Sequence, residues 1–400
     1  NIWKDVKLTI PWLKSDADKI YLKTSSDITW WKDAHKRILS EVDINNGLPA
    51  FTIVWLPDQW VQESKERLRS ALKSSGAKLP PTRITVNLAP ANIKKTGPSF
   101  DLWIAIGILL DQWYIKNDIL IKDSIFLWEL SLDGSLRHIP SVLPATIWAK
   151  EKGFKRLFIP SANTKEASII PDIEVIKIDN LTQLIDILNE DEPYTPESIL
   201  DLSSLREEKI DSWYDFVHVI GQAHAKRALE IAAAGWHNIL MEWPPGSWKT
   251  LLAKSFWTIL PNLTLEEAIE ISKIYSISGL LSNDNPLIVE RPFRSIHHTA
   301  SSVSIIWWWT QAKPWEISLA HKGVLFLDEI LEFQKTVLEV LRQPLEDWEI
   351  TVTRVNASYR YPAKFSLVWA MNPCPCGHYT DPNRKCLCDP GMVKRYLARV

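Results

Sequence analysis

The sequence predicts two successive α/β domains. Short apolar runs alternate with amphipathic segments along most of the chain, which is the pattern of strands and helices that share a core. In the second half, the apolar residues 239–241 are followed by a tight Pro-Pro-Gly-Ser loop, then by Lys249 and Thr250, and then by a helix-like segment. A strand, a tight loop, Lys-Thr and a helix form the layout of a phosphate-binding loop.

Length and composition limit the classes of protein. A chain of 400 residues suggests two domains, and 46% hydrophobic and 24% charged residues suffice for ordinary cores. The net charge of −2 gives no basic field over the whole chain, so nucleic-acid contacts would need local patches. No apolar run reaches the ~18 residues of a transmembrane helix, and the N-terminus has no signal-peptide pattern. We therefore expect a cytoplasmic protein without membrane contact, and the missing initiator Met suggests a fragment.

The first domain is expected over residues 1–189. Residues 83–88 alternate like a strand, and Val61, Leu68 and Leu72 recur at helical spacing within residues 61–72. By the same criteria we expect strands at residues 38–44, 51–56, 125–130 and 157–160, helices at 102–110 and 144–152, and a turn at Asp133-Gly134.

A linker and a second domain follow. Residues 190–212 are polar and contain prolines, which indicates a linker. The second domain then covers residues 213–400 and opens with an Ala-rich helix at residues 221–234. Residues 291–322 have the texture of a long loop insertion.

The expected nucleotide site begins with the phosphate-binding loop. In such loops backbone N–H groups surround the phosphates, a Lys reaches the β- and γ-phosphates, and a Thr hydroxyl holds Mg²⁺. These roles fall to Lys249 and Thr250, with ATP and Mg²⁺ as cofactors. The loop consists of Trp243, Pro244, Pro245, Gly246, Ser247, Trp248, Lys249 and Thr250. The motif G-x-x-x-x-G-K-[ST] requires Gly where this chain has Trp243 and Trp248.

Trp stands where Gly is expected at other positions too. The chain has 13 Gly among its 400 residues, which is about 3% against the usual ~7%, and it has 21 Trp. Trp307, Trp308 and Trp309 form a run in a polar segment, and Trp348 follows Glu-Asp where Gly would complete a turn. We interpret many of these Trp as UGA codons that encode glycine but were translated with a code that reads them as Trp. The alternative is a genuinely Trp-rich relative that cannot use ATP.

Two further strand ends carry the groups that phosphoryl transfer needs. The apolar run 323–327 ends in Asp328, which would hold Mg²⁺, and Glu329, which would polarise the attacking water. A strand ending in Asp-Glu is weak support alone, but it is far stronger after a Lys-Thr phosphate loop. Asn372 ends the apolar run 365–371 and could reach the γ-phosphate or the water; a turn Asn before a proline is the alternative.

All four Cys lie close together near the C-terminus, as Cys374-Pro-Cys376 and Cys386-Leu-Cys388. Four thiolates can close a tetrahedral, structural Zn²⁺ site. Such clustering suits a metal site in a reducing compartment better than a disulfide framework. The spacing differs from the usual C-x₂-C, so reduced thiols or a half-occupied site are the alternatives.

Residues 349–365 are expected to form a β-hairpin. Arg354 and Arg360 lie near its tip, where they could grip DNA phosphates. Two solvated Arg on an exposed hairpin are the equally balanced alternative.

Taken together, these residues resemble the ComM/YifB family of Mg-chelatase-like AAA+ ATPases, over nearly the whole chain from about residue 38. The resemblance rests on long strings, among them Asn-Gly-Leu-Pro-Ala-Phe-Thr-Ile-Val at 46–54, Gly-Pro-Ser-Phe-Asp-Leu at 97–102 and Met-Asn-Pro-Cys-Pro-Cys-Gly at 371–377. The family has Gly where this chain has Trp55, Trp128, Trp236, Trp243, Trp248, Trp307, Trp308, Trp309, Trp315 and Trp348. This agrees with the codon interpretation.

The resemblance implies a fold for each domain. The first would be similar to the C-terminal domain of Lon protease, the ribosomal S5 domain 2-like fold. Ser99 matches the region of the Lon nucleophile, but Leu143 stands where the Lys base would be, so we expect no peptidase activity. The second would be a P-loop AAA+ domain, truncated before its helical lid. The lid and a Leu-Leu-Asp-Arg segment, whose Arg serves a neighbouring subunit, would follow Val400.

The resemblance also implies an activity. Motors of this group form hexameric rings, and related family members promote branch migration during DNA uptake and recombination. We therefore expect an ATPase whose partners are further copies of itself and DNA, with no small-molecule substrate besides ATP. One alternative is a chelatase-type motor for metal insertion. Another, if the Trp are real, is a ring scaffold without ATPase activity.

Overall fold

The structure, a computed structural model, describes residues 7–8, 20–21, 39–45, 48–54, 59–77, 79, 81–89, 101–116, 120–121, 123–199, 214–244, 249–296, 316–354, 357–379 and 384–398. The chain divides into two compact units, Asn1–Leu202 with Gly279–Pro286, and Ser203–Ser278 with Leu287–Val400. The division falls within residues 190–212, where the sequence predicts a linker. Residues 279–286, expected in the second domain, group with the first unit.

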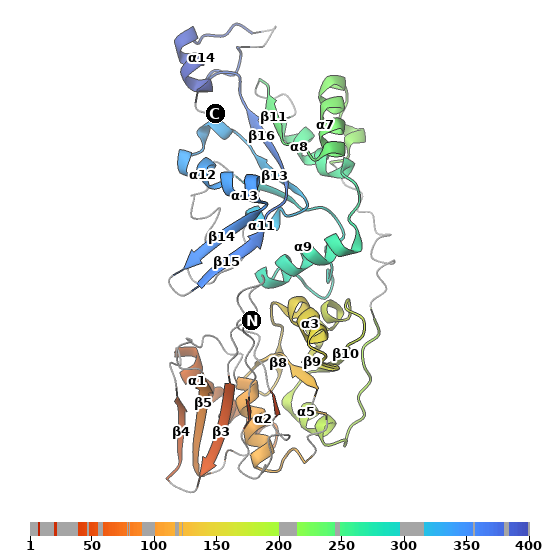
Figure 1. The fold of residues 1–400 in the computed structure, drawn as a ribbon, viewed down its shortest axis with the longest axis vertical. Coiled ribbons are helices and arrows are strands. Elements are labelled where there is room, and N and C mark those ends of the chain that lie inside the picture. Colours follow the sequence, from red (N-terminus) through yellow and green to blue (C-terminus); the bar gives the residue numbers. More distant parts are fainter. Residues whose placement is uncertain are drawn as a thin grey trace. The chain divides into compact units, whose positions relative to one another are not determined.

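The first unit alternates strands with helices (Figure 1). Its elements are β1 (Lys7–Leu8), β2 (Ile20–Tyr21), β3 (Leu39–Asn45), β4 (Ala50–Val54), α1 (Gln59–Ser74), β5 (Arg83–Ala89), α2 (Asp101–Asp111), β6 (Ser124–Phe126), β7 (Glu129–Leu130), β8 (Leu136–Arg137), α3 (Val142–Glu151), β9 (Arg156–Pro160), η4 (Ser161–Asn163), α4 (Thr164–Ala167), β10 (Glu174–Ile178) and α5 (Leu181–Leu188). Apart from the strand predicted at residues 125–130, the strands and helices that the sequence predicts here are present, with ends shifted by a few residues.

One predicted strand of this unit is wrong as a single element. Residues 125–130 divide into β6, which pairs in parallel with β9, and β7, which pairs with β8 in a separate hairpin. The reason lies in the turn at Asp133-Gly134, where Gly134 has a φ of 86°, a value that suits glycine. That turn folds β8 back onto β7 and so draws β7 away from the sheet of β6.

The first unit has two three-stranded sheets, in the orders β3-β5-β4 and β10-β9-β6. The second sheet is parallel and covered on both faces, as crossover helices require. On one face the rings of Phe126 and Phe158 stack 4.6 Å apart and join a core with α1, α2 and α5. On the other face Leu157 and Val175 pack with residues of α3.

The second unit carries the predicted nucleotide-binding motifs. Its elements are η5 (Phe216–His218), α7 (Ala223–Gly235), β11 (Ile239–Glu242), α8 (Lys249–Phe256), η6 (Trp257–Ile259), α9 (Leu265–Ser278), β12 (Phe293–Ile296), α11 (Glu316–Leu319), β13 (Val324–Leu327), η7 (Ile330–Glu332), α12 (Lys335–Val340), α13 (Arg342–Asp347), β14 (Glu349–Arg354), β15 (Ala357–Pro362), β16 (Ser366–Met371) and α14 (Pro390–Leu397). The predicted strand and helix on either side of the phosphate-binding loop, the strand before Asp328, the hairpin and the strand before Asn372 are confirmed as secondary structure.

Two expectations for this unit need correction. Residues 291–322 are not a loop throughout, because they contain β12 and α11; the ring of Phe293 lies 6.0 Å from that of Phe326 and anchors the short strand on β13. Residues 239–241, expected to be a buried strand, lie at one edge of the sheet. There Leu240 is 46% exposed, and of these residues Met241 alone is buried.

The sheet of the second unit has the order β11-β16-β13-β12 and is parallel throughout. Alternate residues point to opposite faces. Val324, Phe326 and Val368 belong to the core that includes α7 and α8, whereas Trp369 and Met371 pack with residues of α12 and α14. The sheet is thus a middle layer between helices (Figure 1). None of the helices among the described residues combines the length and apolar character that a membrane crossing demands.

Candidate nucleotide-binding site

The predicted site residues come from three strand ends. β11 leads toward the loop before α8, β13 ends just before Asp328, and β16 ends just before Asn372. The register pairs Leu327 with Trp369 and Glu242 with Met371, so the three strands end close to the same level. Because the carboxyl ends of parallel strands form the binding edge of an open α/β sheet, residues far apart in the sequence meet here.

Lys249 is the centre of the site. Its ammonium Nζ donates to Asn372 Oδ1 at 2.6 Å, to the carbonyl oxygen of Trp243 at 3.0 Å and to that of Met371 at 3.3 Å. The three acceptors satisfy the three donors of an ammonium group. The pKa of Lys249 is lowered by burial, an effect that the charges of Asp328 and Glu329 offset in part. A phosphate at this position would stabilise the charged form.

Thr250 and Asp328 form the second contact between motifs. Thr250 Oγ1 lies 3.2 Å from Asp328 Oδ2, although the two residues are 78 positions apart. A hydroxyl and a carboxylate supply the hard oxygen ligands that Mg²⁺ prefers, and Mg²⁺ usually takes its remaining ligands from water and nucleotide phosphates. The donor set therefore fits the metal that the sequence predicts.

Glu329 lies beside this pair in an unusual backbone conformation. Its φ is 52°, and its backbone N–H donates to Asp328 Oδ1 at 3.0 Å. A non-glycine residue in the left-handed region costs about 1 kcal/mol, and such residues cluster at functional sites. Glu329 is exposed, so solvent can reach its carboxylate.

Known proteins place the chain in a family. The family model described as magnesium chelatase, subunit ChlI, matches residues 215–400, and that described as subunit ChlI of Mg-chelatase matches residues 40–163. Competence protein ComM of Haemophilus influenzae is 44% identical over 364 residues, covering 90% of this chain and 70% of the relative. The chain belongs to the ComM/YifB family of magnesium-chelatase-like proteins. Protein YifB of Escherichia coli (strain K12) is 38% identical over 363 residues, covering 91% of this chain and 70% of its own length.

Solved structures with limited similarity to this member of the ComM/YifB family include a magnesium chelatase complex and a RuvB variant. A complex of the BchI and BchD subunits of magnesium chelatase matches with a TM-score of 0.32 and 19% identity, over 44% of this chain and 57% of that one. A RuvB variant from Thermotoga maritima matches with a TM-score of 0.24 and 22% identity, over 38% of this chain and 39% of that one.

The phosphate-binding loop of this ComM/YifB member is described at its two ends. Trp243 is half-buried and packs against the core of α7 and α8. Its backbone N–H donates to the carbonyl oxygen of Met371 at 3.3 Å. Pro244 is also described. The expected loop residues Pro245, Gly246, Ser247 and Trp248 lie outside the described residues. The resemblance to the family places Gly at both Trp243 and Trp248.

Other Trp of the chain support the codon interpretation. Trp236 follows α7 with a φ of 53°, and Trp348 follows α13 with a φ of 60°. A left-handed residue just after a helix is most often Gly. Trp128 is 2% exposed, and its indole Nε1 has no hydrogen-bond partner among the described residues. Trp55, Trp307, Trp308, Trp309 and Trp315 lie outside the described residues.

The hairpin of β14 and β15 carries the two Arg expected to contact DNA. Arg354 pairs with Ala357 beside the turn, and its side chain lies outside the described part of the chain. Arg360 is exposed and pairs with Thr351, farther from the turn. The two Arg therefore do not face each other across the hairpin.

The four Cys come together as the sequence predicts for a metal site. Their sulfur atoms all lie within 4.8 Å of one another. Backbone N–H groups of His378 and Leu387 donate to Cys376 and lower its pKa to about 6.

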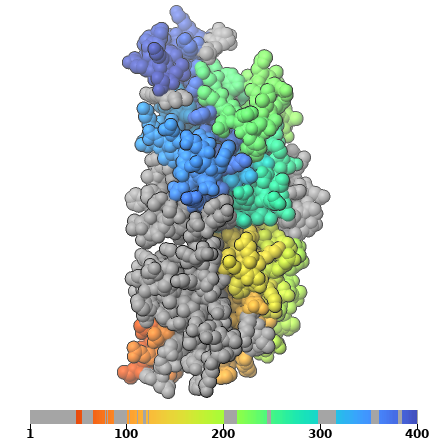
Figure 2. Space-filling model, viewed as in Figure 1, coloured from red at the N-terminus to blue at the C-terminus, as the bar shows by residue number. Residues whose placement is uncertain are grey.

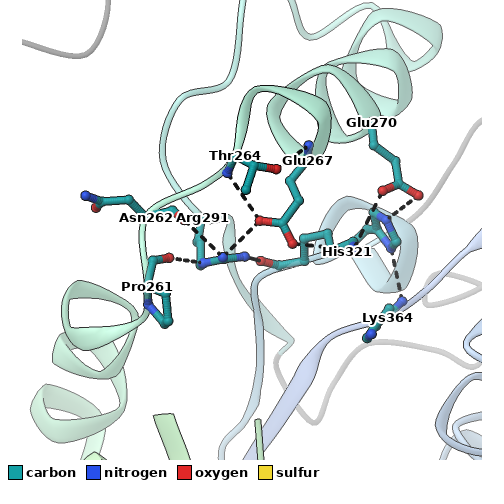
Figure 3. A network of polar contacts seen from close by, with 9 residues as sticks. Pro261, Asn262, Thr264, Glu267, Glu270, Arg291, His321 and Lys364 are labelled. Atoms are coloured by element: carbon teal, nitrogen blue, oxygen red, sulfur yellow. Dashed lines mark hydrogen bonds and ion pairs between the residues drawn. The ribbon is translucent and has the colours of Figure 1, made fainter. Parts of the chain in front are cut away.

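A polar network that the sequence did not reveal joins the amino ends of the strands (Figure 3). Arg291 is buried and donates to the carbonyl oxygens of Pro261 at 2.5 Å and Lys322 at 2.7 Å, and to Glu267 at 3.1 Å. Its guanidinium carbon lies 4.7 Å from the centre of the Trp236 ring. No local pattern indicates such a network, because its members are scattered over the sequence from Pro261 to Lys364.

His321 extends this network. Its Nδ1 accepts from the backbone N–H of Lys364 at 3.1 Å, and its Nε2 lies 3.2 Å from Glu270 Oε1 (Figure 3). The network connects α9 with the starts of β13 and β16. It therefore lies at the amino ends of the strands, whereas Lys249 lies at their carboxyl ends. The network fixes the strands that carry the site.

Proposed function

We propose that this chain is the nucleotide-binding part of a ring-shaped motor that hydrolyses ATP and acts on DNA. The observation that carries the ATPase part is a pair of side-chain contacts at the carboxyl ends of the strands. Lys249 meets Asn372 at 2.6 Å while Thr250 meets Asp328 at 3.2 Å. These are the groups that bind phosphates and Mg²⁺ in P-loop ATPases, and the membership of a magnesium-chelatase-like AAA+ family supports the same conclusion.

The residues divide the work as follows. Bound Mg²⁺ would neutralise charge on the β- and γ-phosphates. Thr250 and Asp328 would hold the metal, and Lys249 would move from Asn372 to the phosphate oxygens. Asn372 would then be released to bind the γ-phosphate or the water. Glu329 would orient the water, whose oxygen bonds to the γ-phosphorus as the bond to ADP breaks.

The ring and DNA parts rest on the family. The relative from Haemophilus influenzae is named a competence protein, and the hexameric ring is the assembly implied by the resemblance. Further copies of the chain and DNA are thus the proposed partners, with Arg354 and Arg360 as local candidates for phosphate contacts. A cytoplasmic location suits both partners.

Measured ATP hydrolysis and nucleotide affinity test the ATPase proposal. We expect Lys249→Met to abolish MgATP binding and Glu329→Gln to retain binding but lose hydrolysis. Lys254→Met is the matched control, because Lys254 lies in the same helix but contacts Tyr214 instead of the site. If the full chain shows no affinity for MgATP by calorimetry, a ring scaffold without ATPase activity is the correct function.

Branched DNA tests the second part. We expect it to bind in a salt-dependent manner and to stimulate hydrolysis. ATP hydrolysis together with DNA binding that is absent, or insensitive to salt, would instead favour a chelatase-type motor. That alternative is supported by the family model, which is described as a magnesium chelatase subunit.

A further inference from the structure

The four cysteines take no part in the proposed ATP chemistry. We propose that Cys374, Cys376, Cys386 and Cys388 bind one structural Zn²⁺, and that this metal fixes the segment that carries Asn372. In the part of the chain that the structure describes, these four cysteines are the group of three or more potential metal ligands (His, Cys, Asp or Glu) whose ligand atoms lie close enough to hold one ion. They are also all the cysteines of the chain, so no other thiol competes for the metal.

The distances between the sulfur atoms match a tetrahedron. Cys374 Sγ lies 3.3 Å from Cys376 Sγ and 3.6 Å from Cys386 Sγ, and the latter two are 3.5 Å apart. Zinc–sulfur bonds of ~2.3 Å place tetrahedral ligands about 3.8 Å apart. A disulfide would need ~2.05 Å, and all four cysteines are free. The sulfurs are therefore spaced as ligands of one ion.

The donor set selects the metal. Four thiolates are soft ligands, which favour zinc or an iron–sulfur cluster over Mg²⁺ or Ca²⁺. An iron–sulfur cluster spreads its cysteines over several iron atoms, whereas these four sulfurs all lie within 4.8 Å of one another. The backbone N–H of Cys388 lies 3.4 Å from Cys386 Sγ, the kind of contact that stabilises thiolate ligands. With all four positions filled by protein, the site is structural rather than catalytic.

The location links the metal to the nucleotide site. Cys374 follows Asn372, the partner of Lys249, after a single proline. At the other end, Cys388 precedes Asp389, whose carboxylate accepts from the N–H groups of Gly391 and Met392 and caps α14. In the space-filling view α14, drawn in dark blue, lies at the outside of the second unit (Figure 2).

Helix α14 also packs back toward the strand that ends in Asn372. Tyr396 and Leu397 join a cluster with Met371 of β16 and with Ile330 and Leu331, which follow Glu329. The metal would therefore tie the end of β16 to the start of α14, while the end of α14 packs back on β16. Without the metal, the segment that carries Asn372 would be fixed by β16 before it but no longer by the cysteine site after it.

Zinc content of the full chain, purified without chelator, tests the proposal. We expect about one zinc ion per chain, and a loss of most of it in Cys376→Ser and Cys388→Ser. Leu387→Ser is the matched control: Leu387 lies between the last two cysteines, is 87% exposed, and receives the same new side chain. A zinc content near zero in the unmodified chain, or equal losses in control and cysteine variants, would overturn the site.

A second measurement guards against variants that fail to fold. The unmodified chain, stripped of metal with a chelator, is titrated with Co²⁺, and we expect the absorption bands of tetrahedral cobalt bound to thiolates. MgATP affinity should fall several-fold on stripping and return with zinc. Absent cobalt bands would overturn the site, whereas unchanged affinity in a stripped, zinc-binding protein would overturn the link to Asn372.

Discussion

Trp348 has a backbone conformation that is unfavourable for its residue type. It follows α13 with a φ of 60°, is 45% exposed, and has the Lys364 ammonium 5.3 Å from its ring centre. The left-handed conformation is unfavourable for any residue with a Cβ, by about 1 kcal/mol, and is neutral for Gly. A weak cation–π contact at an exposed site does not offset that cost.

We therefore expect Trp348→Gly to be more stable than Trp348→Ala by about 1 kcal/mol. Both changes remove the indole and its contact with Lys364, so their difference isolates the backbone. Urea denaturation of the two variants measures it. Equal stabilities would show that the φ of this residue is not strained. The coding DNA gives an independent check, because the codon interpretation requires UGA at codons 236 and 348.

Four residues that the structure brings together, Lys249, Thr250, Asp328 and Asn372, could be selected from the sequence for a physical reason. A phosphate site needs a strand, a tight loop and a helix in immediate succession, so Lys249 and Thr250 are recognisable locally. Asp328 and Asn372 are recognisable because each ends a strongly apolar run. What the sequence could not give is their meeting, since the contact of Lys249 with Asn372 depends on strand order.

At the scale of elements, the network around Arg291 holds the starts of three strands and α9 together. The Arg291 side chain is 5% exposed and its partners include the carboxylate of Glu267. Removing one partner of a buried ion pair leaves the other charge without compensation, which typically costs about 3 kcal/mol. We expect Arg291→Ala to lower the free energy of unfolding by about this amount, measured by chemical denaturation.

Arg227→Ala is the matched control for this prediction. Arg227 pairs with Glu230 on the surface of α7, where their side chains are 73% and 51% exposed. Exposed pairs contribute little, so we expect almost no change in stability. If Arg291→Ala destabilised the chain no more than Arg227→Ala, the network would not be what connects these elements.

The same network predicts a dependence on pH. The hydrogen bond from His321 lowers the pKa of Glu270 below its ordinary value of 4.5. A carboxyl whose folded pKa is depressed contributes stability above its unfolded pKa and loses it as the pH falls through the folded pKa. We expect Glu270→Gln to be less stable than the parent chain at neutral pH, and the gap to close as the pH falls below 4.5. A gap that stays constant over this range in denaturation curves would show that the network does not stabilise the ionised Glu270 carboxylate.

Elements were harder to predict where the decisive contact is distant. The short strand β12 contains only two apolar residues, Phe293 and Ile296, too few to show alternation. It is fixed by its parallel pairing with β13. The apolar run at 125–130 divides because β6 and β7 choose different partners. By contrast, α1 shows helical periodicity and β16 a continuous apolar run, each over enough residues to be recognised from the sequence alone.

At the scale of the whole molecule, the chain gives no general attraction for DNA. Its net charge is −2, so any affinity for a polyanion must come from local basic surfaces. The hairpin of β14 and β15 is the candidate surface, with Arg360 exposed on it. A contact of this kind neutralises a phosphate and releases counterions, which makes the affinity fall as salt rises.

We expect Arg360→Ala to weaken DNA binding and to reduce the slope of log affinity against log salt by about 1, because one phosphate contact is lost. The measurement is fluorescence anisotropy on branched DNA at several salt concentrations. Arg69→Ala, an exposed Arg of α1 in the first unit, is the control and should leave the slope unchanged. An Arg360→Ala variant with the parental slope would mean that the hairpin does not touch DNA. Equal reductions in both variants would mean that contacts are spread over the surface rather than gathered on β14 and β15.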